Sequence, residues 1–216
     1  WSVDLASLLD PRRDALCPIE GRAEWMHTNS LDVNATGDIL FSCRANSILG
    51  VIERASKKLT WKVRPGEVNH QHHATWLANG HIQVFDNGSH AGMAPRSRVI
   101  ELDLATNQVV WQFTGEPGPQ FFSHFISGAD RLPNGNVLVC EGVSGRVFEV
   151  TQRGEVVWEW VSPFAHRYHD SQVTQLFRAH RYGPEHPAVA DRELDPAAHA
   201  QLNHMHGLAY EGARRA

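Results

Sequence analysis

Short runs in which apolar and polar residues alternate recur three times between residues 24 and 162, with polar turns between them. One strand of each unit begins directly after a glycine: Gly37, Gly80 and Gly135 precede the segments DILFSC, HIQVFD and NVLVCE. A period of two over runs of this length is typical of strands and excludes a solenoid of helices. A glycine before each run suits a turn that needs a positive φ. The pattern therefore predicts an all-β chain.

Each glycine-led strand is followed by two more predicted strands. The first carries glutamate after two apolar residues, and the second ends on tryptophan; the glutamates are Glu53, Glu101 and Glu149, and the tryptophans are Trp61, Trp111 and Trp158. The tryptophans recur after 50 and then 47 residues. Four short strands that repeat at about 40 to 50 residues indicate a propeller blade. We predict a β-propeller with four-stranded antiparallel blades, of which about three are complete in this chain, and we expect the tryptophans to be buried between blades.

The strand before each glycine is predicted to be the innermost of its blade, and a histidine precedes each one. The strands cover residues 29–33, 73–77 and 125–132, and the histidines are His27, His72 and His124. Innermost strands line the channel of a propeller, so these side chains are expected to converge on one pocket. The alternative is that His27 and His72 only hydrogen-bond to loop backbone. For the glutamates, a solvated strand face or a salt bridge between blades is favoured over catalysis.

The ends of the chain fit the repeat less well. Residues 1–23 are interpreted as the end of a preceding blade and a loop, residues 24–162 as three blades, and residues 163–216 as an irregular C-terminal extension. A short helix is expected over 195–202, and a further unit could begin at 203–208. Three blades are fewer than the four or more that usually close a propeller. We therefore expect closure by additional blades or by association into a homo-oligomer.

Composition and charge narrow the classes of partner. The 216 residues are 42% hydrophobic with a net charge of -4, so the chain has no basic footprint for nucleic acid and no apolar run long enough to cross a membrane. Small molecules are the expected partners. No targeting signal is visible. Cys17, Cys43 and Cys140 lack CxxC spacing, so neither a zinc knuckle nor a disulfide framework is predicted, although one disulfide is compatible with three cysteines.

An ordered set of motifs resembles the aryl sulfate sulfotransferase family. The motifs are Trp25-x-His27-x-Asn29, Ser42-x-Arg44, Gln71-His72, Phe85-Asp86-Asn87-Gly88, Ser97-Arg98, Pro133-Asn134-Gly135-Asn136 and, later, the segment LFRAHRY at 176–182. The resemblance implies a six-bladed propeller that is periplasmic or extracellular. It also implies transfer of a sulfuryl group from an aryl sulfate to a phenol through a sulfated histidine, without a metal or other cofactor.

The same resemblance implies roles for individual residues. His72 corresponds to the nucleophile, His27 and Arg44 to further catalytic residues, and Asn29 and Arg98 to substrate-binding residues. His124 is added as a substrate-binding candidate on its position alone. Neutral imidazole is a good nucleophile near pH 7, and guanidinium, imidazole and amide donors would stabilise charge on a sulfuryl group. A further histidine that the family carries on an earlier blade has no counterpart here.

Two other classes of function remain open from the sequence. One is a metal-dependent propeller hydrolase or lyase, with axial histidines and carboxylates such as Asp86 as ligands. The repeat contains no HxH or HExxH element, and His204-Met205-His206 lies in the C-terminal extension. The other is a non-catalytic propeller that binds a protein through its loops, since a fold does not determine a function.

Overall fold

The computed structural model describes residues 1–63, 66–92, 96–115 and 121–200. The chain divides into a first compact unit, Trp1–Ala179, and a second unit, His180–Ala216. The described part of the second unit consists of turns and one short 3-10 helix, η2 (Pro196–His199), where a helix over 195–202 was expected. The expected start of a further unit at 203–208 lies outside the described residues.

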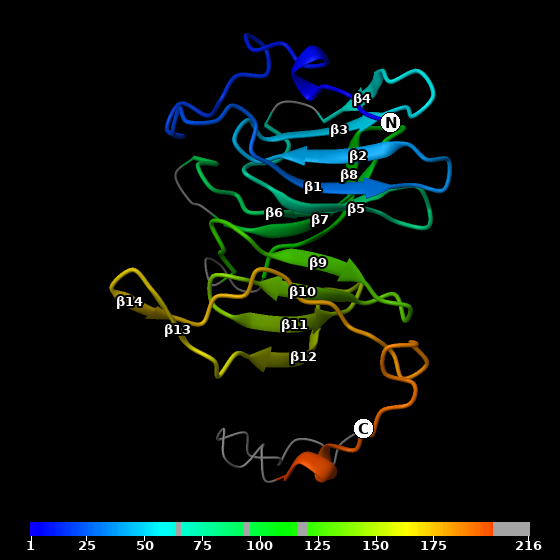
Figure 1. Ribbon diagram of the computed structural model, residues 1–216, viewed down its shortest axis with the longest axis vertical. Coiled ribbons are helices and arrows are strands. Elements are labelled where there is room, and N and C mark those ends of the chain that lie inside the picture. Colours follow the sequence, from blue (N-terminus) through cyan, green and yellow to red (C-terminus); the bar gives the residue numbers. More distant parts are fainter. Residues whose placement is uncertain (64–65, 93–95, 116–120, 201–216) are drawn as a thin grey trace. The chain divides into compact units, whose positions relative to one another are not determined.

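In the described part of the first unit, three four-stranded antiparallel sheets follow one another, each with its strands in chain order (Figure 1). Their strands are β1 (Thr28–Val33), β2 (Ile39–Cys43), β3 (Ile48–Ile52) and β4 (Leu59–Lys62); β5 (His72–Trp76), β6 (Ile82–Asp86), β7 (Arg98–Asp103) and β8 (Gln108–Phe113); and β9 (Gly128–Arg131), β10 (Val137–Glu141), β11 (Arg146–Val150) and β12 (Val156–Val161). The prediction of propeller blades is confirmed. A 3-10 turn, η1 (Leu5–Ser7), precedes the sheets, and a hairpin, β13 (His166–Tyr168) and β14 (Ser171–Val173), follows them.

The three repeat glycines occupy equivalent turns between the first two strands of each blade. Gly37, Gly80 and Gly135 have φ angles of 89°, 84° and 85°. Each amide donates to the carbonyl three residues earlier, at 3.0, 2.9 and 2.9 Å, on Asn34, Leu77 and Leu132. A residue with a Cβ would be strained at this positive φ, which explains why the same residue type recurs there.

The tryptophans are equivalent, as predicted, but the glutamates are not. Trp61, Trp111 and Trp158 pair across the ladder with Val51, Glu101 and Glu149, and in every blade the register shifts one residue further on. Glu53 therefore does not match Glu101 and Glu149, because it lies two positions later, after the end of β3. The matching position in the first blade is occupied by Val51, so alignment on glutamate alone slipped by two residues.

Two of the tryptophans lie between blades. Trp61 packs against the core that the first and second sheets share, and Trp111 Nε1 donates to the carbonyl of Gln152 in the third blade at 2.9 Å. Trp158 is 43% exposed, so the prediction that all three would be largely buried is wrong for this residue. The physical reason is that no further sheet covers β12 in the described part of the chain.

Polar bonds join neighbouring blades in addition to the apolar core. The amide of Ala74 donates to Ser30 Oγ at 3.0 Å, and the amide of Trp76 donates to Asp32 Oδ2 at 2.7 Å. Arg131 forms a salt bridge to Glu101 at 2.7 Å, which confirms the expected link between blades at this glutamate. The first two bonds fix strand β5 to β1, and the first residue of β5 is His72.

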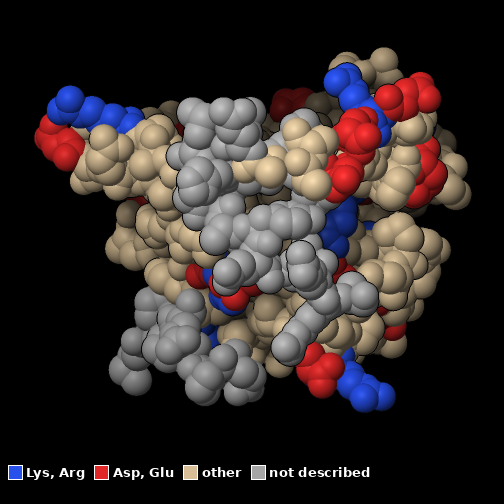
Figure 2. Space-filling view, turned by 90° about the horizontal axis from the view of Figure 1, so that it is seen from below, with Lys and Arg blue, Asp and Glu red and all other residues tan. Residues whose placement is uncertain are grey.

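The first unit extends beyond the three blades. Residues of the N-terminal segment, including Leu9 and Trp25, pack against the first sheet, and Leu176 and Ala179 pack against the third. The unit therefore continues past residue 162 to Ala179. None of the described helices is long and apolar enough to cross a membrane. On the face in Figure 2, acidic and basic side chains of the described residues are intermixed rather than gathered by sign.

Candidate functional site

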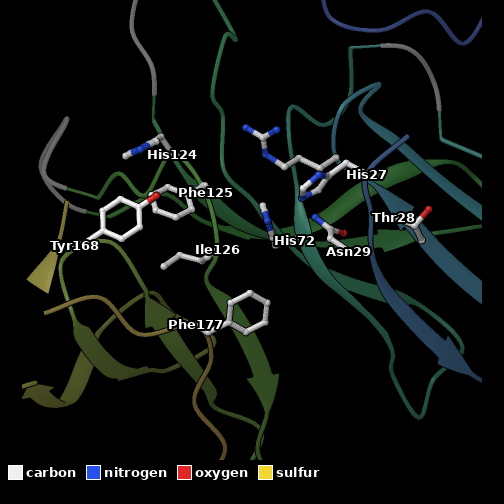
Figure 3. A pocket seen from close by; sticks show the side chains of 10 residues that line it. His27, Thr28, Asn29, His72, His124, Phe125, Ile126, Tyr168 and Phe177 are labelled. Atoms are coloured by element: carbon white, nitrogen blue, oxygen red, sulfur yellow. The ribbon is translucent and has the colours of Figure 1, made fainter. Parts of the chain in front are cut away.

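A cavity of about 610 Å³ lies where the inner ends of the blades meet the loops before β9 and after β14. This volume falls in the range of small-molecule sites, about 300 to 1,000 Å³. The described residues that line it are His27, Thr28, Asn29, Arg44, His72, His124, Phe125, Ile126, Tyr168 and Phe177. The cavity thus brings together every predicted site residue except Arg98. Figure 3 shows His27 and Asn29 on one side, the aromatic residues on the other, and His72 between them.

Hydrogen bonds determine which nitrogen of His72 faces the cavity. Nδ1 lies 2.8 Å from Asn87 Oδ1 and 3.2 Å from the carbonyl oxygen of His70. Asn87 Nδ2 donates to the carbonyls of Ser123 and Ile126 at 2.7 and 3.0 Å, so the amide oxygen is the atom that faces the ring. Both neighbours of Nδ1 are acceptors, and Nδ1 therefore carries the proton. The lone pair is on Nε2, which has no hydrogen-bond partner among the described residues.

His72 is neutral near pH 7 because of its surroundings. Burial lowers the pKa of His72 to about 4, and the positive charge of Arg44 acts in the same direction. The hydrogen bond to Asn87 only partly offsets these effects. A low pKa weakens the basicity of Nε2, but it keeps the uncharged, nucleophilic form fully populated at neutral pH.

The adjacent His73 faces a different part of the molecule. Its φ is 51°, and the register between β5 and β6 shifts between His72 and Thr75, so consecutive side chains leave the strand in different directions. His73 Nδ1 accepts a hydrogen bond from the amide of Ala129 at 3.1 Å, and Nε2 lies 3.6 Å from Asp130 Oδ1. This ring joins β5 to the third blade. The bulge therefore assigns the cavity to the first histidine of the pair.

Ion pairs and a backbone hydrogen bond hold Arg44 and His27, two polar residues that line the cavity, in place. Arg44 Nη1 lies 3.0 Å from Glu20 Oε1. Burial alone would raise the pKa of Glu20, but the hydrogen bond and charge of Arg44 outweigh it and lower that pKa. His27 Nδ1 pairs with Glu24, and the His27 carbonyl accepts from the Arg44 amide at 3.0 Å.

The side-chain amide of Asn29 donates one hydrogen bond within the protein. Its Nδ2 donates to the carbonyl of Gln71 at 2.7 Å, and its buried Oδ1 has no hydrogen-bond partner among the described residues. Gln71 in turn donates to Ser42, Cys43 and Ile48 of the first blade. Asn29 therefore anchors the Gln71-His72 segment. Its side chain keeps an unpaired amide oxygen and a second N–H, so Asn29 can both accept from and donate to a ligand.

The matched family model identifies the chain. The model for arylsulfotransferase (ASST) matches residues 19–163, which is more than half of the 216 residues. The chain belongs to the arylsulfotransferase family. The resemblance noted in the motifs is thereby confirmed at the level of the family. The matched range contains all six predicted site residues, five of which line the cavity.

Solved structures resemble this arylsulfotransferase family member only distantly. A protein of unknown function from Bacteroides caccae is 20% identical, with a TM-score of 0.44 over 62% of this chain and 45% of that one. Virginiamycin B lyase from Staphylococcus aureus is 14% identical, with a TM-score of 0.46 over 63% and 42%. The WD40 β-propeller domain of Doa1 is 14% identical, with a TM-score of 0.48 over 66% and 46%. The chain spans less than half the length of each, and these similarities do not bear on function. No curated protein matches the sequence.

Arg98 is not among the described residues that line the cavity. Its Nε donates to Asp86 Oδ2 at 2.8 Å, and a terminal nitrogen donates to the carbonyl of Glu67. Burial raises the pKa of Asp86, although Arg98 and the amides of Asn69 and Gly88 stabilise its charged form. These bonds indicate that Arg98 fixes the turn after β6, which carries Asn87. A direct contact with substrate, as expected from the sequence, is not supported by this position.

The site contains residues that the sequence interpretation did not select. Asn87 was named only as part of the Phe85-Asp86-Asn87-Gly88 motif and was given no functional role, yet its side chain orients His72. Glu20 lies in a segment taken as a loop, yet it pairs with Arg44. The Asp86-Asn87-Gly88 motif was a signal that could have identified Asn87, whereas nothing in the local sequence marks Glu20. Phe177 and Tyr168, on the apolar wall, come from the extension after residue 162.

Proposed function

We propose that this arylsulfotransferase moves a sulfuryl group from an aryl sulfate to a phenolic acceptor through a covalent intermediate on His72 Nε2. One observation carries the proposal: a neutral imidazole, with its proton fixed on Nδ1 by Asn87, lines the same cavity as Arg44. Such a ring needs no separate base to expose its lone pair.

The transfer takes two balanced steps. In the first, the Nε2 lone pair forms a bond to sulfur while the bond from sulfur to the aryl oxygen breaks, and the phenolate leaves with that electron pair. In the second, the oxygen of the acceptor phenol attacks sulfur, the N–S bond returns its electrons to Nε2, and the phenolic proton passes to a base or water. The ring is positively charged between the steps. The Nδ1–H bond to Asn87 Oδ1 would stabilise that charge.

Arg44 and His27 are suited to the anionic part of the reaction. A sulfuryl group carries negative charge on its oxygens, and a fixed guanidinium stabilises such charge where water is partly excluded. One terminal nitrogen of Arg44 is paired with Glu20, which leaves further N–H donors on the same planar group. His27 uses Nδ1 for Glu24, which leaves its Nε2 for the leaving or attacking oxygen.

The opposite wall of the cavity favours an aryl group. Phe125, Ile126, Tyr168 and Phe177 face His72 across the cavity (Figure 3). The His124 ring packs against that of Phe125 in a tilted arrangement, with ring centroids 4.6 Å apart. Burial lowers the pKa of His124, and the charge of Arg44 adds to this effect. Aromatic and aliphatic side chains beside a few polar groups are typical of pockets that bind a flat apolar ring.

The direct test is to trap the intermediate. The full-length protein is incubated at neutral pH with 4-nitrophenyl sulfate and no acceptor, and the peptide that contains residues 71–73 is analysed under neutral conditions. We expect the mass of one sulfuryl group on His72, one nitrophenolate released per labelled site, and loss of the label when a phenol is added. The His72→Asn variant should not be labelled. A label on His73, or sustained turnover without a label, would refute the proposal.

The alternative of a metal-dependent hydrolase finds little support in the geometry around Asp86. Both carboxylate oxygens of Asp86 are engaged, Oδ1 by the amides of Asn69 and Gly88 and Oδ2 by Arg98. A chelator separates the two mechanisms. Labelling of His72 should persist when EDTA is present, whereas activity that is lost with EDTA and restored by a divalent ion would favour the hydrolase.

A further inference from the structure

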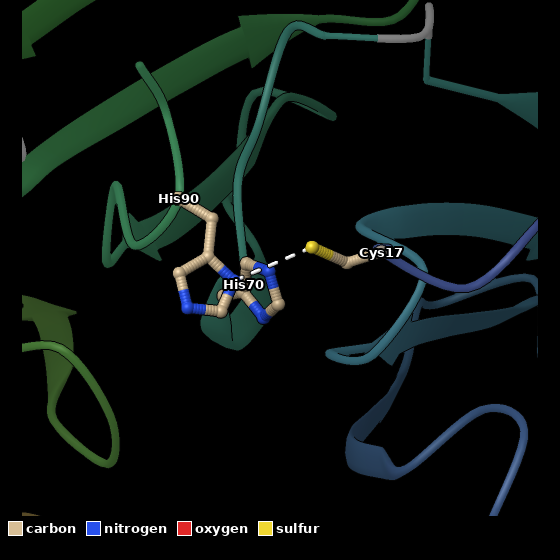
Figure 4. Close-up of side chains that lie close together, drawn as sticks. All are labelled: Cys17, His70 and His90. Carbon is tan, nitrogen blue, oxygen red and sulfur yellow. Dashed lines mark hydrogen bonds between the residues drawn. The ribbon is translucent and has the colours of Figure 1, made fainter. Parts of the chain in front are cut away.

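Three metal-ligating side chains that do not line the cavity meet at one point of the first unit. Cys17 comes from the N-terminal segment, His70 precedes β5, and His90 follows β6. One ligand atom from each lies within 4.8 Å of the others. Cys17 Sγ is 3.3 Å from His90 Nδ1, and the rings of His70 and His90 meet edge to face with centroids 4.5 Å apart (Figure 4).

We propose that Cys17, His70 and His90 form a binding site for a Zn²⁺ ion. Thiolate and imidazole are the preferred protein ligands of Zn²⁺, with bonds near 2.3 Å to sulfur and 2.0 Å to nitrogen. A tetrahedral ion with those bonds separates its sulfur and nitrogen ligands by about 3.5 Å. The 3.3 Å between Cys17 and His90 is close to this value. The three ligand atoms lie within 4.8 Å of one another, so ligands farther apart than this value would move closer when the ion binds. Water would take the fourth position.

His70 is already prepared to act as a ligand. Only 1% of the residue is exposed to solvent. Its Nδ1 has no aligned hydrogen-bond partner among the described residues, although Glu20 Oε1 lies 3.2 Å away. A zinc-bound histidine commonly turns its other ring nitrogen toward a carboxylate. With Nδ1 facing Glu20, Nε2 is the nitrogen left for the ion.

The site would join segments that support the catalytic cavity without entering it. Glu20, three residues after Cys17, pairs with Arg44, and the carbonyl of His70 lies 3.2 Å from His72 Nδ1. His70 and His90 also have positive φ angles of 55° and 62°, which residues with a Cβ adopt at a cost. An ion would stabilise this arrangement of loops. We therefore assign the ion a structural role, distinct from sulfuryl transfer.

The test uses the thiol and needs no substrate. Cys43 and Cys140 are buried and Cys17 is not, so Cys17 is the cysteine expected to react with Ellman's reagent in the folded protein. At a Zn²⁺ concentration ten times the dissociation constant, labelling of Cys17 should slow about tenfold, because only the metal-free fraction reacts. Co²⁺ alone should produce a thiolate-to-cobalt charge-transfer band and tetrahedral ligand-field bands, which Zn²⁺ then removes.

Matched variants make the result specific. Cys17→Ser should remove the charge-transfer band and His90→Ala should weaken Co²⁺ binding, whereas His81→Ala, which alters a histidine paired with Glu101, should change neither. Near-ultraviolet circular dichroism confirms that each variant is folded. No thiol protection by Zn²⁺, or unchanged Co²⁺ spectra in Cys17→Ser, would overturn the proposal. Either result would leave the proposed role of His72 intact, because labelling of His72 is measured separately.

Discussion

His72 Nδ1 and Asn87 Oδ1 lie 2.8 Å apart, and the two hydrogen bonds from Asn87 Nδ2 to Ser123 and Ile126 fix the direction of that amide. The pair therefore determines the tautomer of His72. It also links His72 to the loop before β9, so that two neighbouring blades together orient one ring.

Replacing Asn87 with alanine should slow the labelling of His72 by about 10² or more, because a misoriented or wrong tautomer no longer presents its lone pair. The measurement is single-turnover release of nitrophenolate at saturating aryl sulfate. Asn79→Ala is the matched control, since Asn79 donates to Glu101 outside the cavity. A folded Asn87→Ala variant with an unchanged labelling rate would show that the hydrogen bond does not orient the nucleophile.

The two arginines of the predicted site should respond differently to replacement by lysine. Arg44→Lys keeps the charge but loses the planar group, and loss of one stabilising donor typically costs about 10² to 10³ in rate. Arg98→Lys should act chiefly on stability, because Arg98 neutralises the buried Asp86. Steady-state kinetics and urea unfolding of both variants separate these effects. The opposite ranking would place Arg98 at the substrate.

His73→Ala should destabilise the protein without preventing sulfation of His72. The substitution leaves the buried amide of Ala129 without its acceptor, and an unsatisfied buried group costs about 1 to 3 kcal/mol. Chemical denaturation measures the loss, and the trapping experiment measures the label. Loss of the label from a folded His73→Ala variant would contradict the assignment of the cavity to His72.

The rate of His72 labelling should decline in acid only at an unusually low pH. The reactive form is neutral, and the pKa of His72 is lowered to about 4, so the rate should hold as the pH falls past about 6.5 and decline only near 4. Asn87→Asp places a negative charge beside Nδ1, which raises that pKa and should move the limb to higher pH. A limb centred near pH 6.5 in the unaltered, folded protein would refute this prediction.

The same lowered pKa values predict a loss of stability in acid. His70 and His72 bind protons in the unfolded chain below about pH 6.5, but in the folded protein only near pH 4. The unfolded state therefore binds more protons between these values, and the contribution of both residues to stability is lost as the pH falls through that window. Urea midpoints measured from pH 7 to 4.5 should fall less steeply in His70→Gln than in the unaltered protein.

Much of the fold follows from the sequence alone. Alternation with a period of two, glycines that need a positive φ and tryptophans at blade-length spacing are local properties, and they correctly predicted three blades with equivalent turns at Gly37, Gly80 and Gly135. The glutamate alignment failed at Glu53 because registry between strands depends on partners that are distant in the sequence. Likewise, the exposure of Trp158 depends on what covers β12.

The sequence also placed His27, Asn29, Arg44, His72 and His124 at the ends of strands, where propeller geometry brings them together around one cavity. Only the tertiary structure decided what each side chain does there. The bulge in β5 turns His73 away, Asp86 engages Arg98, and Asn87 reaches His72 while Glu20 reaches Arg44. The physical reason is that hydrogen bonds and burial join residues that are far apart in the chain. Spacing in the sequence can therefore identify a candidate side chain but cannot determine its partner.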